Sequence, residues 1–400
     1  MKNYQDTETG KIHAFEDDVD PHSLNNRNIP LTLSEVVKQK PDGPHVWFQG
    51  DWIKQEDAPP GYKEPVSSVP SYNPAWMAYL RPYTAIHRDE HSSLGISIEQ
   101  INNNSYDGRK LAEVVGVIPL GLASGIPALI SYDGAIAIPQ CEDFPSRSRG
   151  LDKINEILCS LLLGGIHCEV IHPDNMTVGS LMDGKTIFDF TPSMHSRLRL
   201  NCASMQELFL PLMHPRILNV KDLQKAHCDG RAIIRAINNF SPYFLLNGYS
   251  AMINQNNGDA LNNLWIVVEQ LTENLWISKY KKMNNFPQKT RKIYHRLKNE
   301  NKINLVSSKH ILLRLTKFIS RDCYISFSRA RDARNKLAHS GKIPESEIIA
   351  NLWKAIPSLI EEAAGIQGMG MRGRTAINVS NWPAPVKTNF DEWVALAKNM

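Results

Sequence analysis

The sequence predicts an α+β N-terminal domain followed by an all-α bundle of four to five helices. Two Asp-Gly pairs, at 133–134 and 183–184, separate apolar runs of strand length, which indicates β-hairpins. From about residue 259 onward, apolar residues recur at helical spacing. The chain has 400 residues, of which 42% are hydrophobic, so it is long enough to form two domains with ordinary cores.

We divide the chain into four parts. Residues 1–75 are a polar, acidic lead-in rich in proline and asparagine, expected to be irregular with one short strand at 46–48. Residues 76–250 form the α+β domain, and residues 259–365 form the helical bundle. Residues 366–400 are a tail with a short terminal helix. The α+β domain has no assigned role; sensing a trigger, selecting a substrate and binding a partner are all open.

Strands in the α+β domain are expected where apolar residues cluster between turn signals. The expected strands are 114–120, 128–132, 135–138, 168–171, 176–181 and 186–190. The pair Asp133-Gly134 suits a type I′ turn. A helix is expected over 151–163, because apolar residues from Leu151 to Leu161 recur at helical spacing before a glycine pair.

The bundle begins with a long helix whose apolar stripe runs from Leu261 to Leu275, followed by a short basic helix near 289–298. A third helical segment, 309–339, is expected to bend or break near Ser320. It should end at Gly341, because glycine suits the position after a helix. Pro344 and Glu345 open a fourth helix.

The sequence excludes several classes of protein. No apolar run reaches the roughly 20 residues that cross a bilayer, and the N-terminus lacks the apolar core of a signal peptide. A cytoplasmic protein with no membrane contact is therefore expected. The six cysteines are scattered without a Cys-x-x-Cys pair, which indicates reduced thiols. On a strand, His167 would point away from Cys168 and His172, so we expect neither a metal site nor a cofactor.

The net charge of +4 conceals an uneven distribution. Residues 1–60 carry eleven acidic and six basic side chains, whereas residues 259–365 carry nineteen Lys and Arg against ten Asp and Glu. An excess of this size on a helical unit is typical of a protein that binds a phosphate backbone. A solvated basic surface is the alternative interpretation.

One helix face concentrates polar groups with chemical capacity. On a helical wheel of residues 326–340, Ala330, Ala333 and Leu337 share an arc that can pack on a neighbouring helix. Four other side chains fall within an arc of about 140°, and we call them the polar stripe: Arg331, Arg334, Asn335 and His339. The remaining solvent face carries Arg329, Asp332 and Lys336.

The polar stripe has the groups that metal-free cleavage of RNA requires. Guanidinium groups clamp a phosphate and stabilise growing negative charge. Histidine can accept or donate a proton near neutral pH. An amide four residues before it can orient the imidazole or hold a ribose oxygen. These groups can together remove the 2′-hydroxyl proton, support attack on the adjacent phosphate and stabilise the transition state.

The segment from Arg331 to Gly341 resembles the signature of the HEPN superfamily, in which an arginine and a polar residue precede a histidine near a helix end. The preceding long helix with Trp265, Glu269 and Trp276, and the helix after Pro344, also resemble that bundle. The resemblance covers about 105 residues, roughly a quarter of the chain. Residues before about 205 resemble no family.

The resemblance implies a metal-independent endoribonuclease that forms a homodimer, in which two motifs face each other. Arg334 would clamp the phosphate, Asn335 would be the polar partner and His339 would transfer the proton. Arg331 is a supporting residue, and Arg329 and Lys336 are further RNA-binding candidates. Glu269 or Glu273 would orient the site, unless it is a solvated surface residue.

The resemblance also implies a place in anti-phage defence, since many such domains are toxins or abortive-infection effectors, and an antitoxin or defence-system partner is expected. Two alternatives remain open. In the first, the protein binds RNA or scaffolds a complex without catalysis. In the second, the bundle is an interaction module in which His339 only caps its helix.

Overall fold

The computed structural model divides the chain into two compact units, Met1–Ser71 and Tyr72–Met400. The residues that it describes are 2–6, 12–15, 33–35, 45–48, 51–54, 56, 73–88, 97, 99, 100, 103, 105–189, 216–282 and 287–373. The terminal helix expected near 390–397 lies outside these residues.

The first unit contains more strands than the sequence indicates. Its strands are β1 (Lys2–Asp6), β2 (Ile12–Phe15), β3 (Leu33–Glu35), β4 (His45–Phe48) and β5 (Asp51–Lys54). They form a three-stranded sheet, in the order β2-β1-β3, and a separate β4-β5 hairpin. The strand expected at 46–48 is therefore β4, and the expectation of an otherwise irregular segment is wrong. Tyr4 is the only large apolar residue of β1, so no alternating pattern marks that strand.

The second unit is built on a six-stranded antiparallel sheet with the strand order β12-β11-β6-β10-β9-β8. Its strands are β6 (Asn73–Tyr79), β8 (Val114–Pro119), β9 (Pro127–Ser131), β10 (Ala135–Pro139), β11 (Thr177–Met182) and β12 (Thr186–Asp189). Five of these were expected from the sequence. The sixth, β6, lies between β10 and β11 and follows the proline-rich lead-in, whose composition indicated loop.

The two Asp-Gly pairs form different turns. Gly134 has φ 77° but Asp133 does not have positive φ, so the expected type I′ turn between β9 and β10 is wrong. Three residues, 132–134, connect the strands, which fits a type I turn followed by a left-handed glycine. At the second pair both Asp183 and Gly184 have positive φ, at 52° and 63°.

The strand expected at 168–171 does not form. The backbone N–H of Val170 donates to Ser250 Oγ at 2.8 Å, and that of Ile171 donates to Asn155 Oδ1 at 2.9 Å. Side chains of helices thus take the hydrogen bonds that a neighbouring strand would supply. Cys168 is fully buried in this segment. A parallel pair, β7 (Thr84–His87) with β13 (Arg216–Asn219), forms a separate small sheet.

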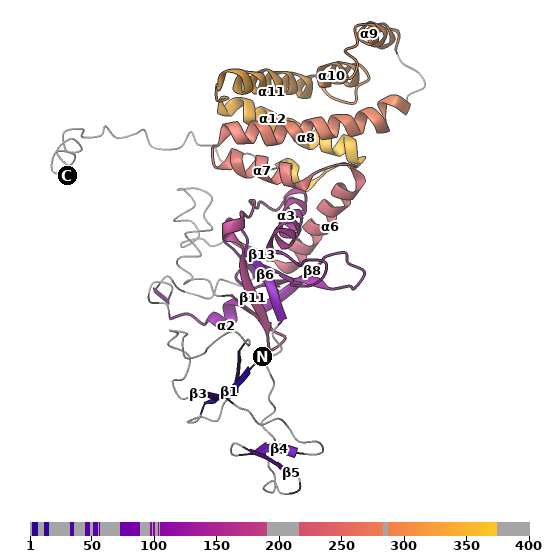
Figure 1. Cartoon of the computed structure of the whole chain (residues 1–400). Coiled ribbons are helices and arrows are strands. Elements are labelled where there is room, and N and C mark those ends of the chain that lie inside the picture. The colour runs from indigo at the N-terminus through magenta and orange to yellow at the C-terminus, as the bar shows by residue number, and fades with distance from the viewer. Residues whose placement is uncertain are drawn as a thin grey trace, which may run out of the picture. The chain divides into compact units, whose positions relative to one another are not determined.

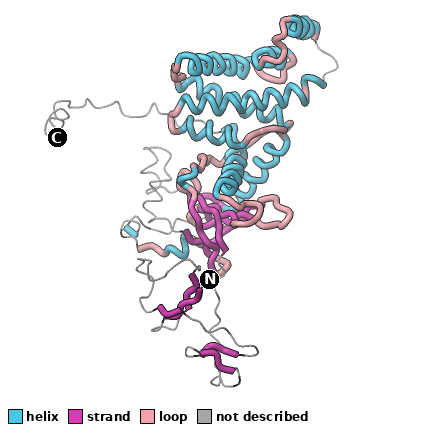
Figure 2. Tube along the Cα trace, in the orientation of Figure 1, coloured by secondary structure: helices cyan, strands magenta, loops and turns pink. Residues whose placement is uncertain are grey.

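Two helices lie between the sheet and the helical bundle, as Figure 1 shows. They are α3 (Arg147–Leu163) and α6 (Val220–Ala236). Helix α3 has Ser146 as its N-cap and begins about one turn before residue 151, where the sequence predicts its start. The short helix α2 (Gly108–Leu111) precedes β8. Figure 2 shows the strands and the helical layers as separate blocks.

The bundle confirms the expected helices. Its members are α7 (Pro242–Ile253), α8 (Asn257–Ser278), α9 (Gln288–Asn299), α10 (Val306–Leu315), α11 (Arg321–Ser340) and α12 (Ser346–Ala364), followed by a short 3-10 turn, η4 (Gly370–Gly373). The third segment breaks between α10 and α11, next to Ser320, as expected. Among the described helices, none combines the length and apolar character that a membrane span requires.

One hydrophobic core joins the layers of the second unit. It runs from Ile136 and Ile138 on the sheet through Leu158 of α3 to Leu264 of α8 and Leu352 of α12, all at most 1% exposed. α7 packs on both α3 and α8. The α+β region and the helical bundle therefore share their interior.

Candidate functional site

Helix α11 carries the polar stripe, and both of its ends are well defined. Ser320 Oγ accepts a hydrogen bond from the Cys323 N–H at 3.1 Å, as an N-cap does. At the other end Gly341 has φ 65°, and its N–H donates to the Leu337 carbonyl at 3.0 Å. This is the left-handed glycine terminator that the sequence predicts. His339 thus lies in the last turn of a capped helix.

One face of α11 packs into the bundle. Phe327, Ala330 and Ala333 are buried, and Leu337 is partly buried against the core. Their spacing gives a continuous inner face, and the two alanines permit close approach. The face packs on α12, α8 and α10. The inner face expected from the helical wheel is therefore confirmed.

The polar stripe lies on the outer side of the helix. Arg334, Asn335 and His339 are exposed, and their side chains form no hydrogen bond or ion pair with another residue of the described part of the chain. Arg331 is 34% exposed, and its Nη2 lies 3.2 Å from Asp332 Oδ1. From Arg331 to His339 the helix rises about 12 Å. The stripe therefore presents two guanidinium groups, an amide and an imidazole that can reach one extended anionic ligand.

The other two basic candidates of α11 flank the stripe. Arg329 and Lys336 are exposed, and neither forms an ion pair with a described residue. They add positive charge next to the stripe without contributing a group that transfers protons near neutral pH.

The two glutamates expected to orient the site have structural partners. Glu269 Oε1 accepts a hydrogen bond from Nε1 of the buried Trp265 at 2.7 Å. Glu273 forms an ion pair with Lys309, whose side chain is only 10% exposed. Neither carboxylate forms a hydrogen bond or ion pair with the stripe. Glu273 thus links α8 to α10 beside the site, whereas the hydrogen bond of Glu269 stays within α8.

Sequence reasoning missed His310, which lies under the stripe. His310 is 3% exposed, and its Nε2 is 2.8 Å from Thr272 Oγ1 on α8. Its ring lies 5.2 Å from that of Phe327 on α11. Burial, with repulsion from Arg331, lowers its pKa to about 4. The imidazole is therefore neutral at physiological pH, and Arg331 is near enough to affect it.

The signal that could have found His310 is its position in the sequence. It precedes Ile311, Leu312 and Leu313 on a short apolar helix, where a histidine is expected to be buried.

The His339 end of α11 is anchored to the start of α8. Asn257 Nδ2 donates to the Pro344 carbonyl at 3.2 Å and to Ser346 Oγ at 3.0 Å. A Cβ at Gly258 would lie 3.9 Å from Leu337 Cδ2, which is ordinary packing distance. The loop after α11 is thus fixed at Pro344, five residues beyond the histidine.

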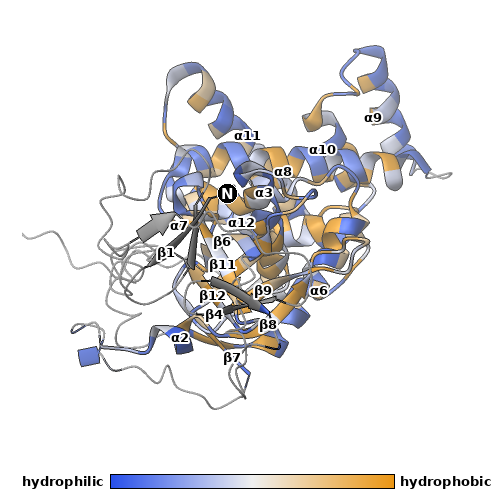
Figure 3. Cartoon of the chain, turned by 60° about the horizontal axis from the view of Figure 1, so that its bottom comes forward, coloured by the Kyte–Doolittle hydropathy of each residue, from blue (hydrophilic) through white to orange (hydrophobic). Residues whose placement is uncertain are grey.

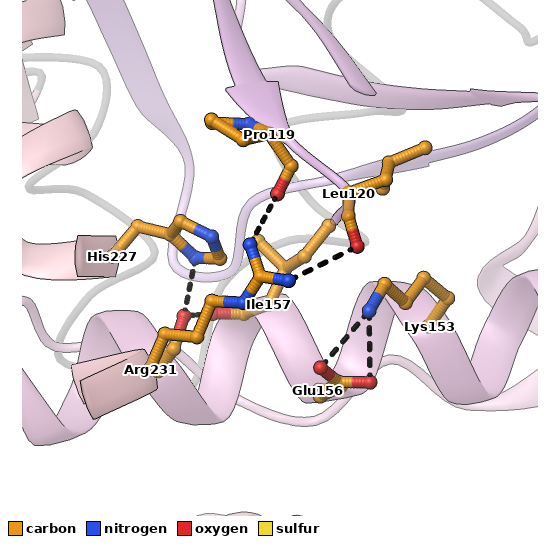
Figure 4. Close-up of polar contacts among 8 residues, drawn as sticks. Pro119, Leu120, Lys153, Glu156, Ile157, His227 and Arg231 are labelled. Carbon is orange, nitrogen blue, oxygen red and sulfur yellow. Dashed lines mark hydrogen bonds and ion pairs between the residues drawn. The ribbon is translucent and has the colours of Figure 1, made fainter. Parts of the chain in front are cut away.

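A second constellation, a serine beside a histidine, lies where α3 and α6 cross (Figure 4). His227 Nδ1 is 2.6 Å from Ser160 Oγ, which also donates to the Ile157 carbonyl at 2.6 Å. Both residues are at most 4% exposed. Burial, followed by repulsion from Arg231, lowers the pKa of His227 to about 4. A buried pair of this kind has no access to a substrate, so it fastens two helices.

Arg231 completes this fastening. Its guanidinium donates to the Pro119 carbonyl at 3.2 Å and to the Leu120 carbonyl at 3.4 Å, as Figure 4 shows. α6 is thereby attached to the end of β8 as well as to α3. The polar groups of this region serve the fold, whereas three residues of the polar stripe on α11 are exposed.

No group of three or more His, Cys, Asp or Glu side chains that could hold a metal ion occurs among the described residues. Comparisons with protein-family models, curated proteins and solved structures find no match to this chain. The functional interpretation therefore depends on the arrangement of its own residues.

Proposed function

We propose that this protein is a metal-independent endoribonuclease of the HEPN type, whose working residues are Arg334, Asn335 and His339 on α11. One observation carries the proposal: the three side chains share the outer face of a capped helix and form no hydrogen bond or ion pair with described residues. Exposed groups of this kind remain available to a substrate, whereas the inner face of α11 packs into the bundle through Phe327, Ala330 and Ala333.

The proposed chemistry is transesterification within RNA. His339 accepts the proton of a 2′-hydroxyl, and the 2′ oxygen attacks the adjacent phosphorus. The bond from phosphorus to the 5′ oxygen breaks, and the departing oxygen takes up a proton, so the reaction consumes no water. The products are a 2′,3′-cyclic phosphate and a 5′-hydroxyl. Arg334, supported by Arg331, stabilises the charge on the phosphate oxygens, and Asn335 orients the imidazole or the ribose.

The test is cleavage of total RNA in the presence of EDTA. We expect the parent to produce cyclic-phosphate ends, and His339→Ala and Arg334→Ala each to lose roughly a hundredfold or more in rate, as is typical when a proton-transfer or charge-stabilising group is removed. Lys354→Ala is the control, because Lys354 is an exposed cation on α12, away from the stripe, and it should cleave like the parent.

Two outcomes would contradict the proposal. If both α11 variants cleave at the parent rate, the residues are wrongly assigned. If the parent binds RNA with steep salt dependence but never cleaves it, the chain is a non-catalytic RNA-binding or scaffold protein.

The proposed enzyme acts as a homodimer through the helical bundle, in the cytoplasm, as an anti-phage defence or toxin effector with a neutralising partner. These features come from the resemblance of residues 331–341 to HEPN domains. Light scattering during size-exclusion chromatography tests whether the protein is a homodimer. A dimer is expected at the concentrations at which RNA is cleaved, and a monomer that cleaves RNA would contradict it.

A further inference from the structure

The basic excess of the helical bundle is concentrated in one short segment. Residues 279–302 carry nine Lys and Arg against Glu300 alone, a net charge of +8, whereas residues 259–365 as a whole have +9. The rest of the bundle has a net charge of only +1, although α11 itself carries five Lys and Arg against two Asp. Most of the net positive charge that attracts a polyanion over long range therefore lies in this segment.

Helix α9 displays this charge on its outer face. The side chains that pack inward are Thr290, Ile293, Tyr294 and Leu297, at the spacing of one helical face. Basic residues cover the remaining half of the helix, and all of them are exposed: Lys289, Arg291, Lys292, Arg296 and Lys298. We call these five residues the α9 basic surface. It contains no apolar side chain.

The α9 basic surface is held in a fixed position at the end of α8. Trp276 of α8 stacks on Tyr280, with ring centroids 4.2 Å apart, and Tyr280 stacks on Tyr294 of α9 at 6.4 Å. Tyr280 is 2% exposed. Figures 1 and 3 show α9 standing at one end of the bundle, beyond α10. The stacked rings keep the basic face turned outward.

Most of this charge is not neutralised within the protein. Glu300 pairs with Lys302 at 2.9 Å and approaches Arg296 at 4.0 Å. Lys289, Arg291 and Lys292 form no ion pair with a described residue. Unpaired positive side chains that are close together in the sequence repel one another. Binding a polyanion would reduce this repulsion, which is already present in the folded protein.

We propose that the α9 basic surface binds the phosphate backbone of RNA at a place separate from the polar stripe, so that the substrate is a long RNA that reaches both. The identity of the nucleic acid rests on the proposed function. A membrane fits less well, since a helix that binds a lipid surface inserts an apolar face, and the apolar face of α9 is packed inside the bundle.

The length of the substrate follows from α8. Its start lies beside the His339 end of α11, through the contacts of Asn257 with Pro344, whereas its end stacks on α9 through Tyr280. From Gly258 to Trp276 the helix rises about 27 Å. At roughly 3.4 Å per nucleotide step in a stacked strand, about eight steps separate the His339 end of the polar stripe from α9. A dinucleotide can occupy the stripe but cannot reach α9.

The test compares a triple variant of the full chain, Lys289→Gln, Arg291→Gln and Lys292→Gln, with the parent. The binding probe is a 2′-O-methyl RNA of about 24 nucleotides, which spans both surfaces and cannot be cleaved by 2′-oxygen attack. We expect the triple variant to lose about tenfold or more in affinity. The slope of log affinity against log salt should fall by about 2, since each phosphate contact to a single strand contributes about 0.7. Turnover of the dinucleotide UpA should be unchanged.

The matched control removes three charges from exposed side chains of another helix, α6, through Lys221→Gln, Lys225→Gln and Arg235→Gln. Equal loss of affinity in both triple variants would overturn the inference, because net charge would then explain it. Loss of binding to phosphatidylserine vesicles with unchanged RNA affinity would also overturn it. If the parent never cleaves RNA but only the α9 variant loses affinity, the inference holds and the proposed function fails.

Discussion

At the scale of single residues, the site combines exposed groups on α11 with a buried histidine beneath them. The neutral form of His310 suits its surroundings, because Trp265 and Phe327 surround the ring and Thr272 supplies one hydrogen bond. A charged imidazole here would lose its hydration and face Arg331. Because His310 is neutral, it places no second positive charge next to Arg331.

The burial of His310 predicts how stability depends on pH. Its pKa is about 4 in the folded protein and close to 6.5 when unfolded. The unfolded state therefore takes up the proton first as the pH falls. Stability is fully present above about pH 6.5 and declines between pH 6.5 and 4, by on the order of 3 kcal/mol for this group. His227, whose pKa is also lowered to about 4, acts in the same direction.

Urea unfolding at a series of pH values measures this decline. In His310→Gln the loss between pH 6.5 and 4 should be smaller than in the parent, even if the variant is less stable at pH 7. An unchanged pH dependence would mean that folding does not lower the pKa of His310. His295, an exposed histidine of α9, is the control position, and His295→Gln should retain the parent profile.

The residues of the polar stripe could be predicted from sequence because they lie on one helix, where spacing alone decides which side chains share a face. His310 could not be predicted in the same way. It is positioned by residues 38 and 17 positions away, Thr272 and Phe327, and only the packing of three helices brings them together.

At the scale of elements, the end of α11 depends on α8. Removing the side chain in Asn257→Ala leaves the Pro344 carbonyl and Ser346 Oγ without their shared donor. We expect a loss of about 1–2 kcal/mol in the free energy of unfolding. We also expect a several-fold lower rate of RNA cleavage, because the loop that follows His339 is released. Thermal unfolding and the EDTA cleavage assay measure the two effects.

Asn262→Ala is the matched control for this prediction. Asn262 is an exposed asparagine on the same helix, with no hydrogen bond to a described residue. It should change stability by less than about 0.5 kcal/mol. Equal effects of the two substitutions would show that the tie between α8 and the loop is unimportant.

The crossing of α3 and α6 depends on glycine. A Cβ at Gly230 would overlap the Ser160 carbonyl oxygen, and one at Gly164 would overlap the Ala226 carbonyl oxygen. Backbone atoms cannot move aside as a flexible side chain can. Gly230→Ala should therefore cost about 3 kcal/mol or more. Gly108→Ala, at a helix start with open space around the new methyl, should be neutral within about 0.5 kcal/mol. Calorimetric unfolding of both variants checks the contrast.

Elements with local signals were predictable, and those defined by distant partners were not. Gly341 ends its helix as expected, since a left-handed glycine acts within one turn. The segment 168–171 has the composition of a strand, but its backbone bonds to Asn155 and Ser250. β6 lacks a local signal and acquires its place in the sheet by pairing with β10 and β11.

At the scale of the second unit, the sequence suggests separate sheet and helical regions, whereas the core is continuous. α7 explains the difference. Leu245 and Leu246 are fully buried in the shared core, and Tyr249 stacks on Trp353 of α12 at 4.7 Å. A helix that is apolar on several sides joins two layers. Which layers it joins cannot be read from its own sequence, because periodicity shows that a face is buried without showing against what.

A shared core predicts that damage on one side of α7 weakens the other. Gly230→Ala lies at the α3–α6 crossing, outside the helical bundle. If the unit opens as one, the variant should reduce the hydrogen-exchange protection of fully buried α8 amides, such as Val267 and Val268, as much as that of Ile136 and Ala137 in β10. For each of these amides, the free energy of exchange should fall by about as much as the free energy of unfolding of the whole protein. Gly108→Ala should leave both sets at parent values. Full protection in α8 together with lost protection in β10 would instead mean that the bundle carrying the polar stripe is stable independently of the sheet.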